Sequence, residues 1–154
     1  MSLEELQAII DSSLRTASPL TRELFAGTHQ DAAAVRDFVN RVMSGTIATV
    51  GASGRPHAAL TLIACSKDGQ LFFAANERSV LFRNLQHSPQ IAMTVDFKDH
   101  GLMAQGQAEL EGQASDLRDS LLPELDALMA HGRWLPEDWQ GFVYRIHLRR
   151  IFPR

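Results

Sequence analysis

Apolar side chains recur every three or four positions near the start of the chain, a spacing that places them on one narrow face of a helix. The residues on this face are Leu3, Leu6, Ile10 and Leu14. Pro19 interrupts the pattern, and Leu24 and Phe25 end the segment before Gly27. Because residues 1–30 are too few to form a core of their own, we expect an arm that packs on the body of the protein or on a partner subunit.

A second helical pattern begins at Asp31, whose side chain is suited to cap the N-terminus of a helix. Its apolar face consists of Val35, Phe38, Val39 and Val42. Gly45 lies where the helix is expected to stop, because glycine favours the backbone conformation that ends helices. The pattern therefore predicts a helix between Asp31 and Gly45.

Short β-rich runs separated by turn residues follow. Turns are predicted at Ala52–Arg55 and Ser66–Gly69, where glycines allow a positive φ angle. Tight turns between such runs are typical of hairpins, so the sheet is expected to begin as an antiparallel meander. Runs at residues 90–97 and 101–111 and an alternating tail at residues 141–154 bring the number of predicted strands to six.

Two more helices are expected between the strands. Ser79 is suited to cap a short helix that Pro89 follows. Ser115 is a candidate cap for an amphipathic helix, which Pro123 is expected to kink or split. The apolar face of that helix consists of Leu117, Leu121, Leu125 and Leu128. Short connections between six strands favour a mainly β (α+β) protein, in which residues 31–154 form a closed antiparallel barrel with flanking helices.

The composition is that of a globular protein, with 45% apolar and 21% charged residues among 154. The net charge of −3 and the absence of a basic stripe speak against nucleic-acid binding. The N-terminus lacks the basic residues of a signal peptide, and no apolar run approaches the ~20 residues of a membrane span. Cys65 is the only cysteine and is interpreted as a buried, inert thiol, so we expect a cytoplasmic protein with no membrane partner.

Most catalytic motifs are missing from the sequence. The six histidines lack metal-binding spacing, and neither a G-x-S-x-G element nor a glycine-rich phosphate loop occurs. The remaining candidate is the helix start at Ser79, where unpaired N–H groups and a partial positive charge favour a phosphate. Arg78 or Arg83 would supply the cation of such a site. The alternative is a plain helix cap beside two solvated arginines.

Four features in this order resemble the pyridoxamine 5'-phosphate oxidase-like split barrels. They are a helix that runs into TIATVG at residues 46–51, the GRPH turn at 54–57, the S-x-x-x-x-N-L-x-x-x-P pattern at 79–89 and Gly-x-Ala at 106–108. The tail YRIHLRRIF is similar to the closing strand of these barrels. The resemblance covers residues 31–154 and implies a six-stranded split barrel that forms a homodimer, with FMN at the subunit interface.

Members of this family hold the FMN phosphate with basic residues on the second strand and at the start of the helix after the third strand. This chain keeps Ser79, but the basic positions are occupied by Ala59, Ala64, Val80 and Leu81. The resemblance therefore implies that Arg78 or Arg83 supplies the cation instead.

The resemblance also implies positions close to the flavin ring. His57 and Thr61 are expected to approach it, although His57 has the alternative of a surface residue beside a turn. Trp134 and Trp139 are candidates to stack over the ring or to reach the partner subunit, with a core or interface position as the alternative.

The leading hypothesis is a homodimeric FMN-binding protein that acts as a flavin-dependent oxidoreductase on a small-molecule substrate. One alternative on the same barrel binds haem or the deazaflavin F420, with His57, His87 or His147 as candidate axial ligands. Another is a cofactor-free dimer with a vestigial pocket. Vitamin B6 oxidation is not expected, because the usual phosphate-binding set is missing and the C-terminal segment is short.

Overall fold

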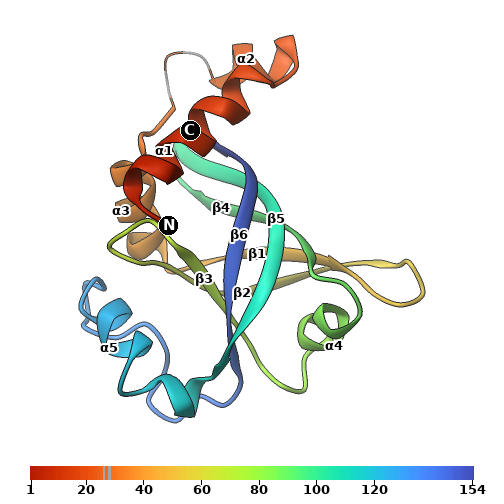
Figure 1. The fold of residues 1–154 in the computed structure, drawn as a ribbon, viewed down its shortest axis with the longest axis vertical. Helices are drawn as coiled ribbons and strands as arrows, with labels where there is room; N and C mark the ends of the chain where they lie inside the picture. Colours follow the sequence, from red (N-terminus) through yellow and green to blue (C-terminus); the bar gives the residue numbers. More distant parts are fainter. Residues whose placement is uncertain (26, 28) are drawn as a thin grey trace.

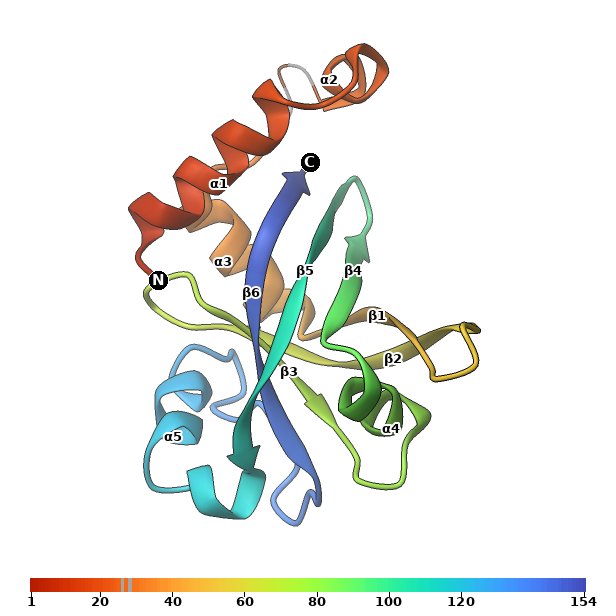
Figure 2. The same ribbon diagram turned by 45° about the vertical axis from the view of Figure 1, so that its right-hand side comes forward.

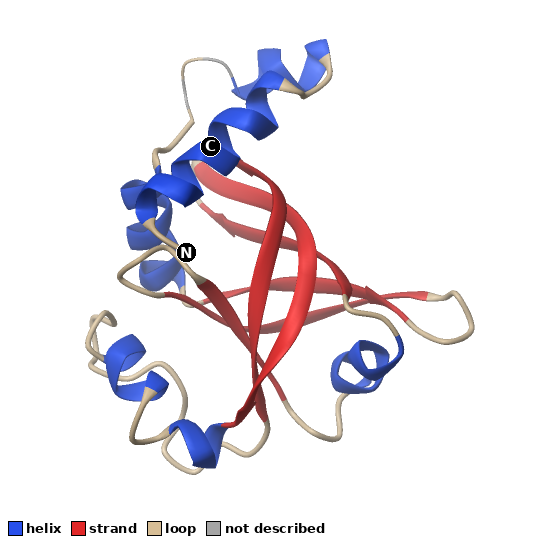
Figure 3. Ribbon diagram, in the orientation of Figure 1, coloured by secondary structure: helices blue, strands red, loops and turns tan. Residues whose placement is uncertain are grey.

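The computed structural model describes residues 1–25, 27 and 29–154, and its central feature is a closed barrel of six strands (Figures 1 and 3). The strands are β1 (Ser44–Val50), β2 (Pro56–Cys65), β3 (Leu71–Ala75), β4 (Gln90–Phe97), β5 (His100–Gln113) and β6 (Phe142–Pro153). Their order around the barrel is β1-β2-β3-β6-β5-β4, and every neighbouring pair is antiparallel. The predicted fold class is confirmed.

Helices surround the barrel. They are α1 (Leu3–Arg15), α2 (Pro19–Phe25), α3 (Ala32–Val42), α4 (Val80–His87), the 3-10 helix η1 (Ala114–Leu117) and α5 (Leu121–Asp126). Helices α1 and α3 cover one end of the barrel, whereas α4 and α5 lie toward the other end (Figures 1 and 2). Among the described residues, none of these helices is both long and apolar enough to cross a membrane.

Local sequence signals produce the hairpins and the helix starts as predicted. Gly54 and Gly69 adopt positive φ angles of 78° and 89° in the two turns that flank β2. Asp31 accepts a hydrogen bond of 2.8 Å from the Ala34 amide at the start of α3. Ser79 accepts one of 3.0 Å from the Phe82 amide at the start of α4. Each of these contacts lies within five residues in the sequence, which is why the sequence alone predicts them.

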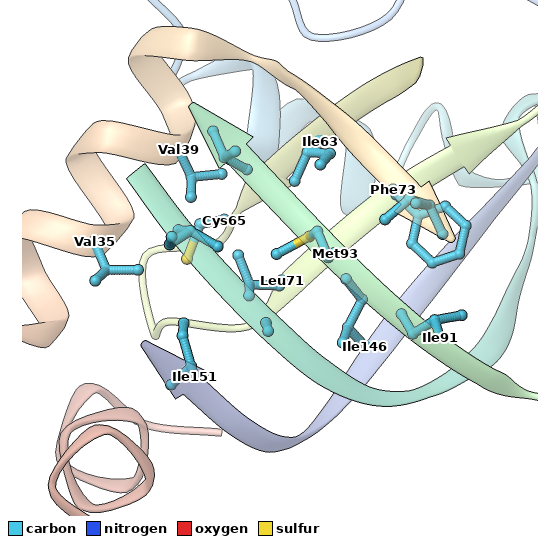
Figure 4. Close-up of a cluster of buried hydrophobic side chains, with 14 of the residues drawn as sticks. Val35, Val39, Ile63, Cys65, Leu71, Phe73, Ile91, Met93, Ile146 and Ile151 are labelled. Atoms are coloured by element: carbon cyan, nitrogen blue, oxygen red, sulfur yellow. The ribbon is translucent and has the colours of Figure 1, made fainter. Parts of the chain in front are cut away.

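The main core lies inside the barrel and extends to the helices at its end. Figure 4 shows Val35 and Val39 of α3 facing aliphatic side chains from several strands, among them Ile63, Leu71 and Ile146. The predicted apolar face of α1 joins this core, since Leu6 and Ile10 are fully buried. The first helix therefore packs on the body of its own chain.

A second apolar cluster lies outside the barrel, where the segment that contains η1 and α5 covers β3 and β6. It includes Phe72 and Ala74 of β3, Val143 of β6 and Trp134 of the loop after α5. Trp134 is 2% exposed, so its interpretation as a core aromatic is confirmed. This cluster makes both faces of β3 apolar, and all five residues of the strand are buried.

The prediction that Gly45 ends the third helix was wrong. Helix α3 ends at Val42, and Met43 adopts the left-handed conformation with φ of 62°. Gly45 instead belongs to β1, where an added Cβ would lie 2.4 Å from Cδ1 of Ile63 and 2.6 Å from the Thr94 carbonyl oxygen. Glycine is required there because a strand passes close to the core, not because a helix stops.

The prediction that Ser115 caps an amphipathic helix was wrong, whereas the expected split of that helix is confirmed. Gln113 precedes the short helix η1, and α5 starts separately after Ser120. Pro123 lies in the first turn of α5 and has no N–H group to bond to the carbonyl four residues earlier, so a continuous helix would break at this point. The split allows Ala114 and Leu125 to enter the second cluster from two separate segments.

Candidate functional site

The barrel opens between β2 and β3. These strands pair only at Ile63–Phe73, Ala64–Phe72 and Cys65–Leu71. Beyond this point β2 continues beside β1, whereas β3 turns away beside β6 and leads to α4 (Figure 2). The β3-facing edge of β2 therefore has no strand partner along residues 56–62. One bond still crosses the gap, because the Thr61 hydroxyl donates to the Ala74 carbonyl.

A cavity of about 380 Å³ lies in this gap, within the size range of small-molecule sites. Its walls come from β2, the end of β3, the start of α4 and the loop before β6. The lining residues are Ser44, Ala59, Leu60, Thr61, Leu62, Ala74, Ala75, Asn76, Ser79, Leu81 and Trp139. None of these eleven described side chains carries a charge, so the cavity has mainly apolar walls with a few hydroxyl and amide groups.

Hydrogen bonds within the chain hold the turn into α4. The Ser79 hydroxyl donates to the Asn76 carbonyl at 2.6 Å while it accepts from Phe82. The Asn76 side chain accepts from the Arg78 amide at 2.9 Å and donates to the Gln140 carbonyl at 3.3 Å. Asn76 thus ties the start of α4 to the loop before β6, and these two segments form facing walls of the cavity.

Half of the predicted site residues meet in this cavity. Thr61, Ser79 and Trp139 line it, although they are up to 78 positions apart in the sequence. His57, Arg78 and Arg83 are not among the lining residues. Arg78 and Arg83 are both exposed on the outside of the α4 region. Their proposed contact with a phosphate stays a prediction.

His57 is close to the site along β2. It lies two and four positions before Ala59 and Thr61, so the three side chains point to the same face of the strand. His57 is opposite Thr49 on β1. Its Nδ1 atom is buried and makes no hydrogen bond within the described residues. An unpaired ring nitrogen next to a cavity is a polar group available to a ligand that extends along this face.

Trp139 owes its position to a glycine. The partly buried ring lies over Gly141, where an added Cβ would come within 2.6 Å of the ring and 2.5 Å of the Ala75 carbonyl oxygen. Gly141 also adopts a φ angle of 146°, which other residues rarely take. The loop before β6 can therefore bring Trp139 down onto the end of β3.

Asn84 fixes helix α4 against the barrel. It is 6% exposed and donates a hydrogen bond of 3.0 Å to the hydroxyl of Thr49, which is 2% exposed. Gly51 leaves room for it, because a Cβ there would lie 2.9 Å from Oδ1 of Asn84. This pair joins the helix that carries Ser79 to the first strand of the barrel.

Sequence reasoning missed Asn76, Leu60 and Leu62, whereas Ala59 and Leu81 had been named as positions that hold cations in the family. Asparagine is a common turn residue, and this signal was available for Asn76, three residues before the cap of α4. Leu60 and Leu62 had no such signal, because whether an apolar strand residue faces a cavity depends on where the neighbouring strand leaves it.

A second, larger cavity lies elsewhere in the part of the chain that the structure describes. This cavity of about 580 Å³ lies between the end of α2, the β4–β5 hairpin and the end of β6, and contains none of the predicted residues. Within the described residues, no group of three or more His, Cys, Asp or Glu side chains is arranged to hold a metal. Burial raises the pKa of the Cys65 thiol to about 12, so it stays protonated and unreactive at neutral pH, as expected.

The other candidate haem ligands lie away from this cavity. His87 is exposed in the last turn of α4, and His147 is exposed on β6, where its Nε2 atom contacts the Glu109 carboxylate. Neither lines the gap between β2 and β3.

Several solved structures are similar to this chain in fold. A conserved hypothetical protein from Mycobacterium tuberculosis has 22% identity and a TM-score of 0.64, with 83% of this chain and 86% of the other covered. The FAD binding protein from Mycobacterium smegmatis has 18% identity and a TM-score of 0.58, with 82% and 96% covered. A protein of unknown function from Agrobacterium tumefaciens has 22% identity and a TM-score of 0.61, with 80% of this chain covered. This chain spans 55% of the Agrobacterium protein.

Two further proteins with the same fold are described by other cofactors, F420 and heme. One is an F420 Reductase with 20% identity, a TM-score of 0.56 and coverages of 75% and 94%. The other is a heme binding protein from Mycobacterium smegmatis with 19% identity, a TM-score of 0.54 and coverages of 80% and 54%. No match was found among curated proteins.

The sequence itself matches the family described as Pyridoxamine 5'-phosphate oxidase over residues 32–138. This range runs from α3 to the loop before β6 and includes every strand that lines the cavity. The chain belongs to the pyridoxamine 5'-phosphate oxidase family.

Proposed function

We propose that the cavity between β2 and β3 binds the ring system of a flavin, and that the protein is a flavin-dependent oxidoreductase acting on a small molecule. The observation that carries this proposal is the unpaired edge of β2 beside an apolar cavity. Backbone N–H and C=O groups on such an edge need partners. A flat heteroaromatic ring with donors and acceptors along one side supplies them.

The walls of the cavity suit a ring of this kind. Leu60, Leu62 and Leu81 provide apolar contact, and Trp139 provides an aromatic face. The Thr61 hydroxyl lies at the opening edge of β2. When bound, a flavin supplies hydride or electron transfer, while the protein orients the ring and excludes water from it. The FAD binding protein with the same fold adds support from a relative.

We also propose that a second copy of the chain completes the site. The outer face of β2 and β1 is uncharged, with Pro56, Ala58 and Leu60 opposite Val50, Ala48 and Thr46. Leu60 is 79% exposed and Val50 43%, an unusual exposure for aliphatic side chains on a sheet. Because Leu60 both belongs to this face and lines the cavity, a partner on the face would also close the cavity.

The flavin proposal is tested by absorption spectroscopy and thermal melting of the full chain. Purified protein, or protein with added flavin, is expected to show the two-banded spectrum of bound flavin. A ligand at a hundredfold excess over its dissociation constant stabilises the fold by about 2.7 kcal/mol, or about 5–10 °C for a chain of this size. An intense Soret band would point to haem instead, and binding of F420 alone would point to the deazaflavin.

The dimer proposal is tested by sedimentation of matched variants. The natural chain is expected to sediment as a dimer at micromolar concentration, and Leu60→Lys is expected to produce monomers that bind flavin more weakly. Leu110→Lys is the control, because Leu110 is 51% exposed on β5, away from this face. A natural chain that sediments as a monomer would contradict the proposal.

A further inference from the structure

We propose that this cavity recognises flavins by the ring alone, so that riboflavin, FMN and FAD bind with similar dissociation constants. The inference rests on the proposed function and adds to it the part of the ligand that determines affinity. Three features of the site carry it: the charge of the lining, the state of the donors at α4, and the position of the arginines.

The part of the lining that one chain supplies offers no cation to a phosphate. Among the described residues around the cavity, all eleven side chains are neutral. A phosphate gains most from charge-assisted bonds to arginine or lysine, and these shorter bonds are roughly twice as strong as neutral ones. A phosphate in this cavity would leave water without that compensation.

The start of α4 has few free donors. The Arg78 amide donates to the Asn76 side chain at 2.9 Å, and the Ser79 amide donates to the Asn76 carbonyl at 3.0 Å. The Ser79 hydroxyl donates to the same carbonyl, and the Phe82 amide donates to Ser79. Asn76 and Ser79 thus already occupy three of the amides around this helix start, those of Arg78, Ser79 and Phe82. The Val80 and Leu81 amides are the two that remain at this helix start.

The side chains of the two arginines in this region are exposed to solvent. Arg78 and Arg83 are exposed and do not line the cavity. Arg78 also follows Glu77 directly, so the turn into α4 carries no net charge from this pair. A phosphate held here by mobile surface side chains would be strongly screened by salt.

A flavin bound in this way leaves its phosphate in water. The ring would contact the β2 edge and Trp139, and the rest of the flavin would lie outside the neutral lining. Riboflavin lacks the phosphate, and FAD carries an adenylate beyond it, yet neither difference would change the contacts inside the cavity. The flavin is then an exchangeable ligand, not a tightly held cofactor.

Titration of the full chain with the three flavins tests the inference. Riboflavin, FMN and FAD, followed by fluorescence quenching, are expected to have dissociation constants within about threefold of each other. Raising NaCl from about 50 to about 500 mM is expected to leave the FMN constant unchanged within the same factor, because no cation contact is screened. The double variant Arg78→Ala/Arg83→Ala is expected to behave like the natural chain.

A gain-of-charge variant provides the matched control. Val80 is the first residue of α4, is 40% exposed and lies beside Ser79, so arginine is tolerated there. Val80→Arg is expected to tighten FMN about tenfold without changing riboflavin, and Val80→Gln is expected to change neither. An unchanged ratio in Val80→Arg would contradict the explanation by the missing cation.

The outcomes separate this inference from the proposed function. FMN binding at least about tenfold tighter than riboflavin, with the advantage lost in Arg78→Ala/Arg83→Ala, would overturn the inference and leave the proposed function intact. If none of the three flavins binds or raises the melting temperature, the proposed function is overturned and the inference falls with it. Similar constants for all three support both.

Discussion

Replacing Asn40 by alanine is expected to destabilise the protein, because its side chain pairs with the backbone at the end of β2. Strand β1 begins at Ser44, opposite Leu62, so Cys65 at the end of β2 has no partner residue on β1. The Asn40 side chain takes the place of the missing strand. Its Nδ2 donates to the Cys65 carbonyl at 2.8 Å, and its Oδ1 accepts from the Cys65 amide at 2.8 Å.

The magnitude follows from burial. Asn40 is 6% exposed and Cys65 is fully buried, so water cannot replace these bonds after truncation. Leaving a buried donor or acceptor unpaired costs about 1–3 kcal/mol per group, and two groups are left in this variant. We therefore expect a loss of about 2–6 kcal/mol in the free energy of unfolding. For a chain of this length the loss corresponds to a fall of about 4–24 °C in melting temperature.

Urea unfolding followed by circular dichroism measures the loss in Asn40→Ala. The control is Gln86→Ala, which removes an exposed amide from helix α4 and is expected to change stability by less than about 0.5 kcal/mol. If Asn40→Ala loses no more than the control, the amide does not replace a strand partner and the reasoning is wrong.

Three further predictions concern the barrel, the pH dependence and the support of the site. Gly106→Ala is expected to prevent native pairing of β5 with β6, because the new Cβ would lie 2.1 Å from the His147 carbonyl oxygen. The expected result is a fall in the free energy of unfolding above about 3 kcal/mol, or insoluble protein. The control Gly54→Ala, at an open turn with φ of 78°, is expected to lose only about 1 kcal/mol in the same urea assay. Burial raises the pKa of Cys65 from 9.0 to about 12 and that of Tyr144 from 10.0 to about 12. Since the unfolded chain releases these protons first, stability is expected to fall with rising pH above about 9 because of Cys65 and above about 10 because of Tyr144, by up to about 1.4 kcal/mol per pH unit for each group until about pH 12. Unfolding titrations from pH 8 to 11 measure the slope, and Cys65→Ala should remove the part that begins at about pH 9. Asn84→Ala is expected to lower the free energy of unfolding by about 1–3 kcal/mol and to weaken flavin binding, since it removes the hydrogen bond between α4 and Thr49. An unchanged flavin dissociation constant in this variant would show that the position of α4 does not matter for the ligand.

Signals that act over a few residues were enough to predict most of the elements. The side chains of Asp31 and Ser79 bond to amides three residues later, and Gly54 and Gly69 allow turns that no other residue favours. Together with the spacing of apolar residues, they predict six strands, helices α1, α3 and α4 and the antiparallel order. The barrel and its family followed from the order of these elements.

The local signals were misleading where a residue serves a distant partner. Gly45 was interpreted as a helix stop, but its lack of a side chain makes room for Ile63 and for the Thr94 backbone. Ser115 was interpreted as a cap, but it lies inside η1, and α5 begins separately at Leu121, so that two short segments reach the second cluster. A residue type that satisfies a local rule can be required for a contact that the rule does not describe.

The candidate site belongs almost entirely to the tertiary structure. Ser79, Thr61 and Trp139 were predictable as polar or aromatic candidates, but only the folded barrel shows that they surround one cavity, with Arg78 and Arg83 outside it. The reason is geometric: the cavity exists because β3 leaves β2 after three residue pairs and continues beside β6. The sequence by itself determined which segments become strands, and tertiary packing alone decided where two of them separate and what surrounds the space between them.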